Sequence, residues 1–166
     1  PGDRFLHSFA LGFDASIGAI TRTLCAGATL HIANEDALLS GPALVRLARD
    51  SKSTHLNMVP SLLEMLPEDE LPSVRVVVVG GEACPAHLVA RWAPGRKFLN
   101  VYGPTEVTIG STAYECPADG GTPPIGRPIA NRQLYILDGY LNPVPIGVPG
   151  EIYLGGVGLA RGHLHR

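Results

Sequence analysis

Five consecutive residues, Tyr-Gly-Pro-Thr-Glu at 102–106, carry side chains that suit nucleotide binding. The ring of Tyr102 could stack on a base, the hydroxyl of Thr105 could bond a phosphate oxygen, and a carboxylate oxygen of Glu106 could hold Mg²⁺. A structural interpretation is open as well: a Gly-Pro turn followed by a helix-capping threonine, which in an arbitrary protein is the commoner explanation.

Two other segments carry weaker signals. Gly80 and Gly81, followed by Glu82, end a β-branched run and would let a planar ligand approach the backbone, although most Gly-Gly pairs serve structural turns. Asp14 lies where a predicted strand passes into a predicted helix. It could be the N-cap of that helix, which its spacing favours, or a buried carboxylate that pairs with a cation.

Histidine and cysteine offer little further chemistry. The six histidines are scattered without a metal-binding i, i+4 pair in a helix, so we interpret them as surface or satisfied core residues. Cys84 lies beside a predicted helix N-terminus that could lower its pKa, but no base is evident nearby. Three cysteines without C-x-x-C spacing argue against disulfides and a structural zinc, and favour a reducing cytosol.

The composition is that of a globular domain. The chain has 166 residues, 45% of them hydrophobic and 17% charged, and a net charge of -2. This charge provides no basic patch for nucleic acid and no polybasic membrane anchor, and the apolar runs are too short to span a bilayer. No secretory signal is visible at the N-terminus.

The first two thirds of the chain alternate strand and helix patterns. Strands are predicted at residues 5–10, 29–33, 54–59, 74–79 and 97–101, and helices at 16–25, 41–50, from 60 onward and at 85–92. This order predicts an α/β fold with a mainly parallel, flavodoxin-like sheet and helices on both faces. Because ligands bind beyond the carboxyl ends of such strands, residues 80–82 and 102–106 should lie at one edge.

The pattern changes near residue 117. A Pro/Gly-rich connection leads to short strands at 133–137 and 151–154, which predict a small antiparallel, barrel-like unit. We therefore expect two parts: an α/β subdomain with the substrate pocket and adenine edge at 1–117, and a partial β-barrel subdomain at 118–166. The abrupt start and finish suggest a fragment or an excised subdomain.

Three ordered motifs resemble the adenylation domains of nonribosomal peptide synthetases, within the adenylate-forming superfamily. Residues 13–16 look like F-D-x-S, and 100–106 match N-x-Y-G-P-T-E. Residues 150–164 match G-E-L-x-I-x-G-x-G-L-A-R-G-Y-L, with His163 in place of the usual tyrosine. The resemblance covers essentially the whole chain, and three motifs in order outweigh the structural interpretations given above.

The resemblance implies roles in binding ATP. Tyr102 would stack against adenine, Thr105 would contact the α-phosphate, and Glu106 would coordinate Mg²⁺, so that Thr105 and Glu106 are the expected catalytic residues. The backbone of Gly81 and Glu82 would line the adenine slot. The whole expected nucleotide-binding set is Gly80, Gly81, Glu82, Asn100, Tyr102, Gly103 and Thr105.

The resemblance also implies an amino-acid pocket. Asp14 would pair with the α-ammonium group of the substrate, which acyl- and aryl-activating relatives do not need. Matched by their offset from the motifs, the lining positions are Asp14, Ala15, Gly18, Asn57, Val78, Gly80, Val101, Ile109 and Gly110. Three glycines among nine positions suggest a roomy pocket for a long or bulky side chain, with Asn57 as the hydrogen-bonding wall group. The amino acid itself is not identified.

The implied reaction is attack of an amino-acid carboxylate on the α-phosphate of ATP, followed by transfer to the phosphopantetheine thiol of a carrier-protein domain. A carboxylate is already ionised near pH 7, so catalysis rests on positioning and charge neutralisation rather than on a general base. The family's phosphate loop, ribose-binding aspartate and catalytic lysine do not occur in this sequence, so we expect the isolated chain to be inactive.

Two alternatives stay open. One is a fragment of an acyl- or aryl-CoA synthetase, against which Asp14 argues. The other is an excised, non-catalytic specificity subdomain. An unrelated flavodoxin-like domain would require all three motifs to arise by coincidence.

Overall fold

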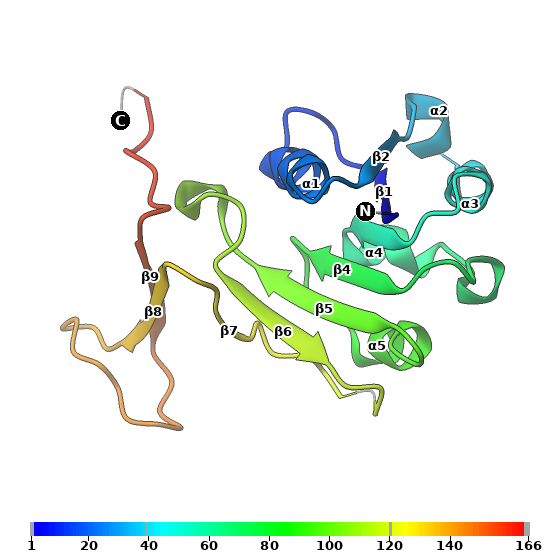
Figure 1. Ribbon diagram of the computed structural model, residues 1–166. Helices are drawn as coiled ribbons and strands as arrows, with labels where there is room; N and C mark the ends of the chain where they lie inside the picture. The colour runs from blue at the N-terminus through cyan, green and yellow to red at the C-terminus, as the bar shows by residue number, and fades with distance from the viewer. Residues whose placement is uncertain (1, 39, 120, 165–166) are drawn as a thin grey trace.

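A seven-stranded sheet and a two-stranded sheet make up the framework of the computed structural model, which describes residues 2–38, 40–119 and 121–164 (Figure 1). The large sheet has the order β2-β1-β3-β4-β5-β6-β7. Its parallel strands are β1 (Arg4–His7), β2 (Thr29–Ile32), β3 (His55–Met58), β4 (Val76–Gly80) and β5 (Lys97–Tyr102). The order of these five strands is that of flavodoxin, so the predicted fold class is confirmed.

Two antiparallel strands extend the large sheet beyond β5. They are β6 (Thr112–Cys116) and β7 (Arg127–Pro128), and neither was predicted. β6 escaped prediction because its sequence, Thr-Ala-Tyr-Glu-Cys, contains no sustained apolar alternation. The second sheet pairs β8 (Arg132–Leu137) with β9 (Glu151–Gly156), at the two places where strands were expected.

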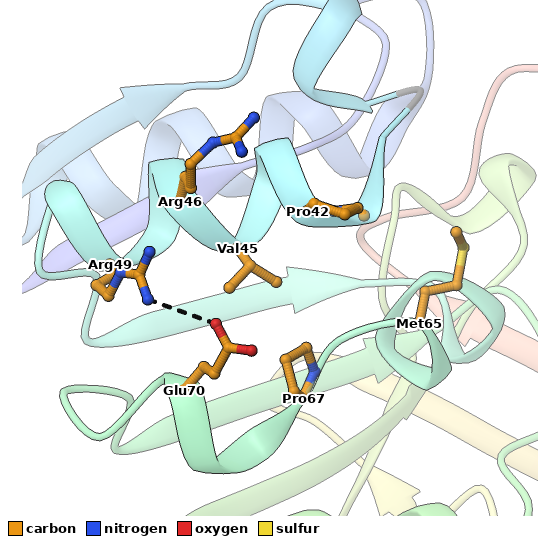
Figure 2. A pocket seen from close by; sticks show the side chains of 8 residues that line it. Pro42, Val45, Arg46, Arg49, Met65, Pro67 and Glu70 are labelled. Atoms are coloured by element: carbon orange, nitrogen blue, oxygen red, sulfur yellow. Dashed lines mark hydrogen bonds and ion pairs between the residues drawn. The ribbon is translucent and has the colours of Figure 1, made fainter.

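The predicted helices occur in the predicted order, as α1 (Asp14–Cys25), α3 (Gly41–Asp50), α4 (Pro60–Glu64) and α5 (Ala86–Trp92). The short helix α2 (Glu35–Leu38) and the 3₁₀ turns η1 (Glu68–Glu70) and η2 (Thr105–Val107) were not predicted. An ion pair of 3.4 Å between Arg49 and Glu70 joins α3 to η1 (Figure 2). Within the described ranges, no helix has the length and apolar character needed to cross a membrane.

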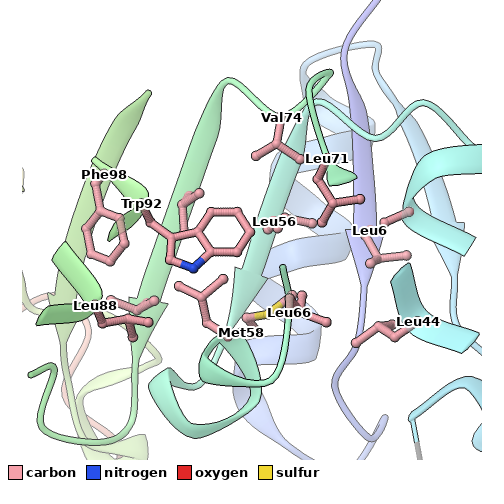
Figure 3. Close-up of a cluster of buried hydrophobic side chains, with 14 of the residues drawn as sticks. Leu6, Leu44, Leu56, Met58, Leu66, Leu71, Val74, Leu88, Trp92 and Phe98 are labelled. Carbon is pink, nitrogen blue, oxygen red and sulfur yellow. The ribbon is translucent and has the colours of Figure 1, made fainter. Parts of the chain in front are cut away.

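One face of the sheet forms the hydrophobic core. Leu6, Leu56, Val77 and Phe98, from four neighbouring strands, pack with residues of α3, α4 and α5 (Figure 3). Because successive side chains of a strand point to opposite faces, the alternate positions project to the other side. Buried β-branched and aromatic residues on the core face hold the strands in a fixed register, which in turn fixes where each strand ends.

Helix α1 lies on the opposite face and packs through small residues. Its buried positions are Ser16, Gly18, Ala19 and Thr23. Ile17 and Leu24, which gave the helix its apolar spacing in the sequence, are 52% and 61% exposed. The spacing therefore predicted the helix but not its buried face, because small side chains let α1 approach the sheet closely.

Substitutions of the buried Trp92 test the packing of the core. Trp92 is fully buried, and its indole nitrogen has no hydrogen-bond partner in the part of the chain that the structure describes. We expect Trp92→Ala to lower the free energy of unfolding by about 3–5 kcal/mol, measured by denaturant titration. Trp92→Phe should cost clearly less, because it keeps most of the ring contacts and removes an unpaired buried donor.

Tyr140→Ala provides the control, because Tyr140 is 88% exposed and its truncation should change stability by no more than about 0.5 kcal/mol. Equal losses for Trp92→Phe and Trp92→Ala would contradict this account of the core.

Candidate functional site

A groove of about 490 Å³ lies at the carboxyl edge of β4 and β5. Five residues of the predicted nucleotide set line it: Gly81, Glu82, Asn100, Tyr102 and Gly103. The other lining residues are Ala83, Cys84, Val101, Pro104, Thr122, Pro123 and Ile125. The other two members of the predicted set, Gly80 and Thr105, are not among the lining residues. The structure thus brings together two segments that the sequence placed at one edge.

The first wall of the groove is the turn after β4. Gly81 has a φ of +84°, which favours glycine, and a Cβ on Gly80 would lie 2.7 Å from the carbonyl oxygen of Val101. The carboxylate of Glu82 accepts hydrogen bonds from the backbone N–H and the hydroxyl of Ser61, at 3.0 and 2.9 Å. Glu82 therefore ties this turn to the start of α4 and is also one of the residues that line the groove.

The second wall is the reversal of the chain after β5. The backbone N–H of Ser111 donates to the carbonyl oxygen of Tyr102 at 2.8 Å. Gly103 lies so close to the backbone of Ile109 and Ser111 that no Cβ fits there. Thr108 and Ile109 both have positive φ values, 60° and 70°. The reversal holds the ring of Tyr102 at the edge of the groove.

The third wall comes from the Pro/Gly-rich connection, which sequence reasoning missed. The side-chain amide of Asn100 donates to the carbonyl oxygen of Pro124 at 2.9 Å, and the hydroxyl of Thr112 donates to that of Ile125 at 2.5 Å. Gly126, at φ +89°, passes too close to the carbonyl of Ala113 for any side chain. The composition of this connection is typical of a linker, so nothing in it signalled a binding wall.

Asp14 does not cap α1. The N-cap residue is Phe13, without a side-chain cap bond, and Asp14 is the first residue of the helix. Its Oδ2 atom is buried and has no hydrogen-bond partner among the described residues. The capping interpretation is therefore wrong. A buried carboxylate oxygen without a partner is costly, so the site favours a donor or a cation at this position.

Thr105 and Glu106 lie in η2, just beyond the groove. The turn has Pro104 at its N-cap and no side-chain cap bond, so the helix-capping interpretation of Thr105 is also wrong. Glu106 is exposed and pairs with His163 at 3.3 Å between Oε1 and Nε2. No group of three or more metal-ligating side chains occurs within residues 2–38, 40–119 and 121–164.

The predicted pocket positions meet across α1, the sheet and the reversal loop. Asn57 is buried and lies opposite Val78 in the sheet, and Gly80 lies opposite Val101. A Cβ on Gly18 would lie 3.2 Å from the side chain of Ile109. A Cβ on Gly80 would likewise lie 2.7 Å from Val101, so at both glycines the nearest neighbour is another predicted lining residue. The roominess of the pocket stays a prediction.

A second hollow, of about 280 Å³, lies between α3 and η1 on the helix-covered face (Figure 2). Its lining residues are Gly41, Pro42, Val45, Arg46, Arg49, Met65, Pro67 and Glu70. None of the predicted site residues lies there. The chemistry-bearing side chains gather instead at the carboxyl edge of the sheet.

Comparison with known proteins establishes the family. The sequence model of the AMP-binding enzymes matches residues 1–164. The chain belongs to this family. Its resemblance to adenylation domains of nonribosomal peptide synthetases is likewise confirmed by relatives and solved structures.

Among the relatives, a linear gramicidin synthase of Brevibacillus parabrevis is 52% identical over 163 residues, which are 98% of this chain and 2% of that protein. The solved nonribosomal peptide synthetase FmoA3 (S1046A) has a TM-score of 0.89 and 34% identity, over 99% of this chain and 19% of that one. The Vibrio cholerae adenylation domain AlmE, solved with glycyl-adenosine-5'-phosphate, has a TM-score of 0.89 and 30% identity, over 99% of this chain and 34% of that one. The chain thus spans a small part of the proteins that it matches.

The thiol of Cys84, which lines the groove, does not have the lowered pKa that its place beside a helix N-terminus could have given it. Burial, together with the neighbouring Cys116, raises its pKa to about 11, and burial also raises the pKa of Cys116. Desolvation disfavours the thiolate, and this increase in pKa outweighs any decrease caused by the N-terminus of the nearby short helix α5. Cys84 is therefore unsuited to act as a nucleophile near neutral pH.

This predicts the order of thiol labelling. A pKa of about 11 leaves roughly one thiolate in a thousand at pH 8, against about one in four for an ordinary thiol of pKa 8.5. In the native protein, iodoacetamide should label the exposed Cys25 well before the buried Cys84 and Cys116, as followed by peptide mass spectrometry. In guanidinium chloride all three should react alike. Native Cys84 labelling as fast as Cys25 would refute this assignment.

Proposed function

We propose that this chain is the amino-acid-selecting and adenine-binding part of an adenylation domain. The complete domain would use ATP to convert an amino acid into aminoacyl-AMP and would load it onto the phosphopantetheine thiol of a carrier protein. The small share of each relative that the chain spans supports the view that residues outside it complete the active site, and we expect the isolated chain to be inactive. Three free cysteines agree with a reducing, cytoplasmic location.

The observation that carries this proposal is the buried carboxylate oxygen of Asp14, which has no hydrogen-bond partner within residues 2–38, 40–119 and 121–164. Asp14 lies at the start of α1, and four residues further on a Cβ added to Gly18 would lie against Ile109 in the reversal loop. That loop begins directly after the groove residue Tyr102. A substrate with its carboxylate near the groove would thus present its α-ammonium group to Asp14, which a fatty or aryl acid cannot do.

The groove supports a nucleotide. Its volume of about 490 Å³ falls in the usual range for small-molecule sites, about 300–1,000 Å³. Tyr102 would stack on adenine, with the Gly81 and Glu82 backbone and the Asn100 amide around its edge. The related AlmE domain was solved with glycyl-adenosine-5'-phosphate, which supports an aminoacyl adenylate as the class of ligand.

Thr105 and Glu106 would face the phosphates. The Thr105 hydroxyl would donate to an α-phosphate oxygen, and Glu106 would supply one carboxylate ligand to Mg²⁺. This fits the ordinary behaviour of Mg²⁺, which combines one or two protein carboxylates with substrate phosphate oxygens. When bound, the ion would neutralise part of the phosphate charge.

The reaction needs orientation more than proton transfer. An oxygen of the substrate carboxylate attacks the α-phosphorus, a new P–O bond forms, and the bond to the β-phosphate breaks to release pyrophosphate. No proton moves, because the carboxylate is already ionised. Asp14 holds the ammonium group, Tyr102 holds the base, and together they place carboxylate and phosphorus for in-line attack.

Asp14→Asn in the complete domain tests the role of the carboxylate. Hydrogen bonds to charged groups contribute about 1.5–3 kcal/mol, so KM for the amino acid should rise about 10- to 100-fold. KM for ATP should change little, as measured by amino-acid-dependent ATP–pyrophosphate exchange. The matched control is Asp69→Asn, an exposed carboxylate on η1.

An unchanged KM for the amino acid in Asp14→Asn would contradict the proposal. Pyrophosphate exchange driven by fatty or aryl acids, and by no amino acid, would assign the domain to the acyl- or aryl-activating enzymes instead.

Tyr102 is tested by a pair of substitutions. Stacking of a base on an aromatic ring contributes about 1–3 kcal/mol, so Tyr102→Ala should raise KM for ATP about 5- to 100-fold. Tyr102→Phe keeps the ring and should leave KM for ATP nearly unchanged. Equal effects of the two substitutions in the same exchange assay would show that the ring does not stack on the base.

A further inference from the structure

The loop that carries Ile109 is held in a conformation that its own residues disfavour. Thr108 and Ile109 have φ values of 60° and 70°. Both residues are β-branched, and for such residues the left-handed region is a genuine outlier. A conformation of this kind persists only where the surroundings enforce it, and it commonly occurs at ligand sites. Contacts from outside the loop must therefore hold it.

The guanidinium of Arg132, the first residue of β8, bonds the loop on both sides of Ile109. Its Nη2 donates to the carbonyl oxygen of Thr108 at 3.2 Å, and its Nε donates to that of Gly110 at 3.3 Å. A charged donor strengthens such bonds, and the planar guanidinium presents its N–H groups in a rigid fork. Arg132 lies 22 residues or more from both partners in the sequence. The second sheet thus reaches back to fix the reversal loop.

The C-terminal segment around Gly158 leaves space for the guanidinium of Arg132, whose two hydrogen bonds to the loop are called the Arg132 clasp below. A Cβ on Gly158 would overlap the guanidinium of Arg132. The carbonyl oxygen of Gly158 accepts a hydrogen bond from the Thr108 hydroxyl at 2.7 Å, and the backbone N–H of Ala160 donates to the carbonyl oxygen of Glu106 at 2.7 Å. In Figure 1 this segment, drawn in red, runs beside the loop that follows β5. Arg132 therefore lies between the loop and the segment.

Ile109, which lies between the two residues held by the Arg132 clasp, is part of the proposed pocket. Ile109 lies 3.2 and 3.3 Å, through its Cγ2 and Cδ1 atoms, from the position of a Cβ on Gly18. It thus forms the wall between α1 and the loop. If the loop relaxed to ordinary φ values, Ile109 would swing away and the space over Gly18 would open.

We propose that Arg132 is a specificity-positioning residue: by holding the carbonyls of Thr108 and Gly110, it keeps Ile109 over Gly18 and so limits the size of the amino acid that the pocket accepts. This inference rests on the proposed function. Arg132 need not touch the substrate, because it acts through Ile109.

The test is the substitution Arg132→Met in the complete adenylation domain. Methionine has a side chain of similar length but no hydrogen-bond donors. Amides of residues 105–111 should exchange with deuterium about tenfold faster or more, since bonds from a charged donor are lost. In pyrophosphate exchange, the preference for the best amino acid over one longer by a methylene or two should narrow by about tenfold. Arg132→Lys should restore part of the slow amide exchange and part of the amino-acid preference, because an ammonium can still reach one carbonyl.

Two further variants separate this role from a general loss of structure. Arg46→Met removes an exposed arginine of α3 and should change neither the amide exchange nor the amino-acid profile. In an Ile109→Gly background, Arg132→Met should broaden the profile no further, because the wall side chain is already gone. Equal broadening in both backgrounds would overturn the role assigned to Ile109.

The outcomes for the inference and for the proposed function are distinct. Two results in an active Arg132→Met domain overturn the inference alone. One is unchanged amide exchange, and the other is faster amide exchange with an unchanged amino-acid profile. An unaltered domain that exchanges pyrophosphate with no amino acid overturns the proposed function, and the selectivity claim with it.

Discussion

The tight reversal of the chain between Tyr102 and Ser111 is the constraint on which the site depends. Gly103 is pressed so closely against the returning backbone that a side chain cannot be accommodated there. This contact turns β5 into the antiparallel β6 and leaves Tyr102 at the mouth of the groove. The same reversal places Thr105 and Glu106 beyond the sheet edge and directs Ile109 toward α1. One turn thus positions the groove residue Tyr102, the residues proposed to face the phosphates, and the side chain proposed as a pocket wall.

The two faces of the sheet divide the work between stability and binding. On the core face, residues such as Leu56 and Phe98 pack against three helices and fix the strand register. On the other face, His7, Asn57 and Val78 lie side by side across three strands, and His7 contacts Ser16 of α1 at 3.2 Å. A rigid core thus sets the positions of the polar groups near the site. At the start of α1, the burial of the unpaired Asp14 carboxylate oxygen favours a ligand with a donor or a positive charge.

Local sequence patterns predicted the framework well, and the residues that depend on distant contacts poorly. The β-branched run of β4 and the alternation of strands and helices predicted the parallel sheet, and the carboxyl-edge rule then predicted that the two Gly-containing turns would meet. Spacing alone favoured a capping role for Asp14, and only the resemblance to adenylation domains pointed to a buried carboxylate. The N-cap of α1 is Phe13, a choice of backbone conformation that residue spacing does not reveal. The roomy pocket was inferred from its glycines, but the sequence could not show that Ile109 lies next to Gly18 and Val101 next to Gly80. The wall at Thr122, the strand β6 and the clasp of Arg132 all arise from contacts between residues far apart in the chain, for which no local pattern exists.

The central claim is that one edge of this sheet holds both ends of an aminoacyl adenylate. The most direct measurement is a crystal structure of the complete domain with a non-hydrolysable aminoacyl-adenylate analogue. We predict adenine stacked on Tyr102 between the Gly81 turn and the Pro123 wall, with the α-ammonium group within hydrogen-bond distance of the Asp14 carboxylate. An analogue bound elsewhere, or one whose ammonium group lies away from Asp14, would contradict the account.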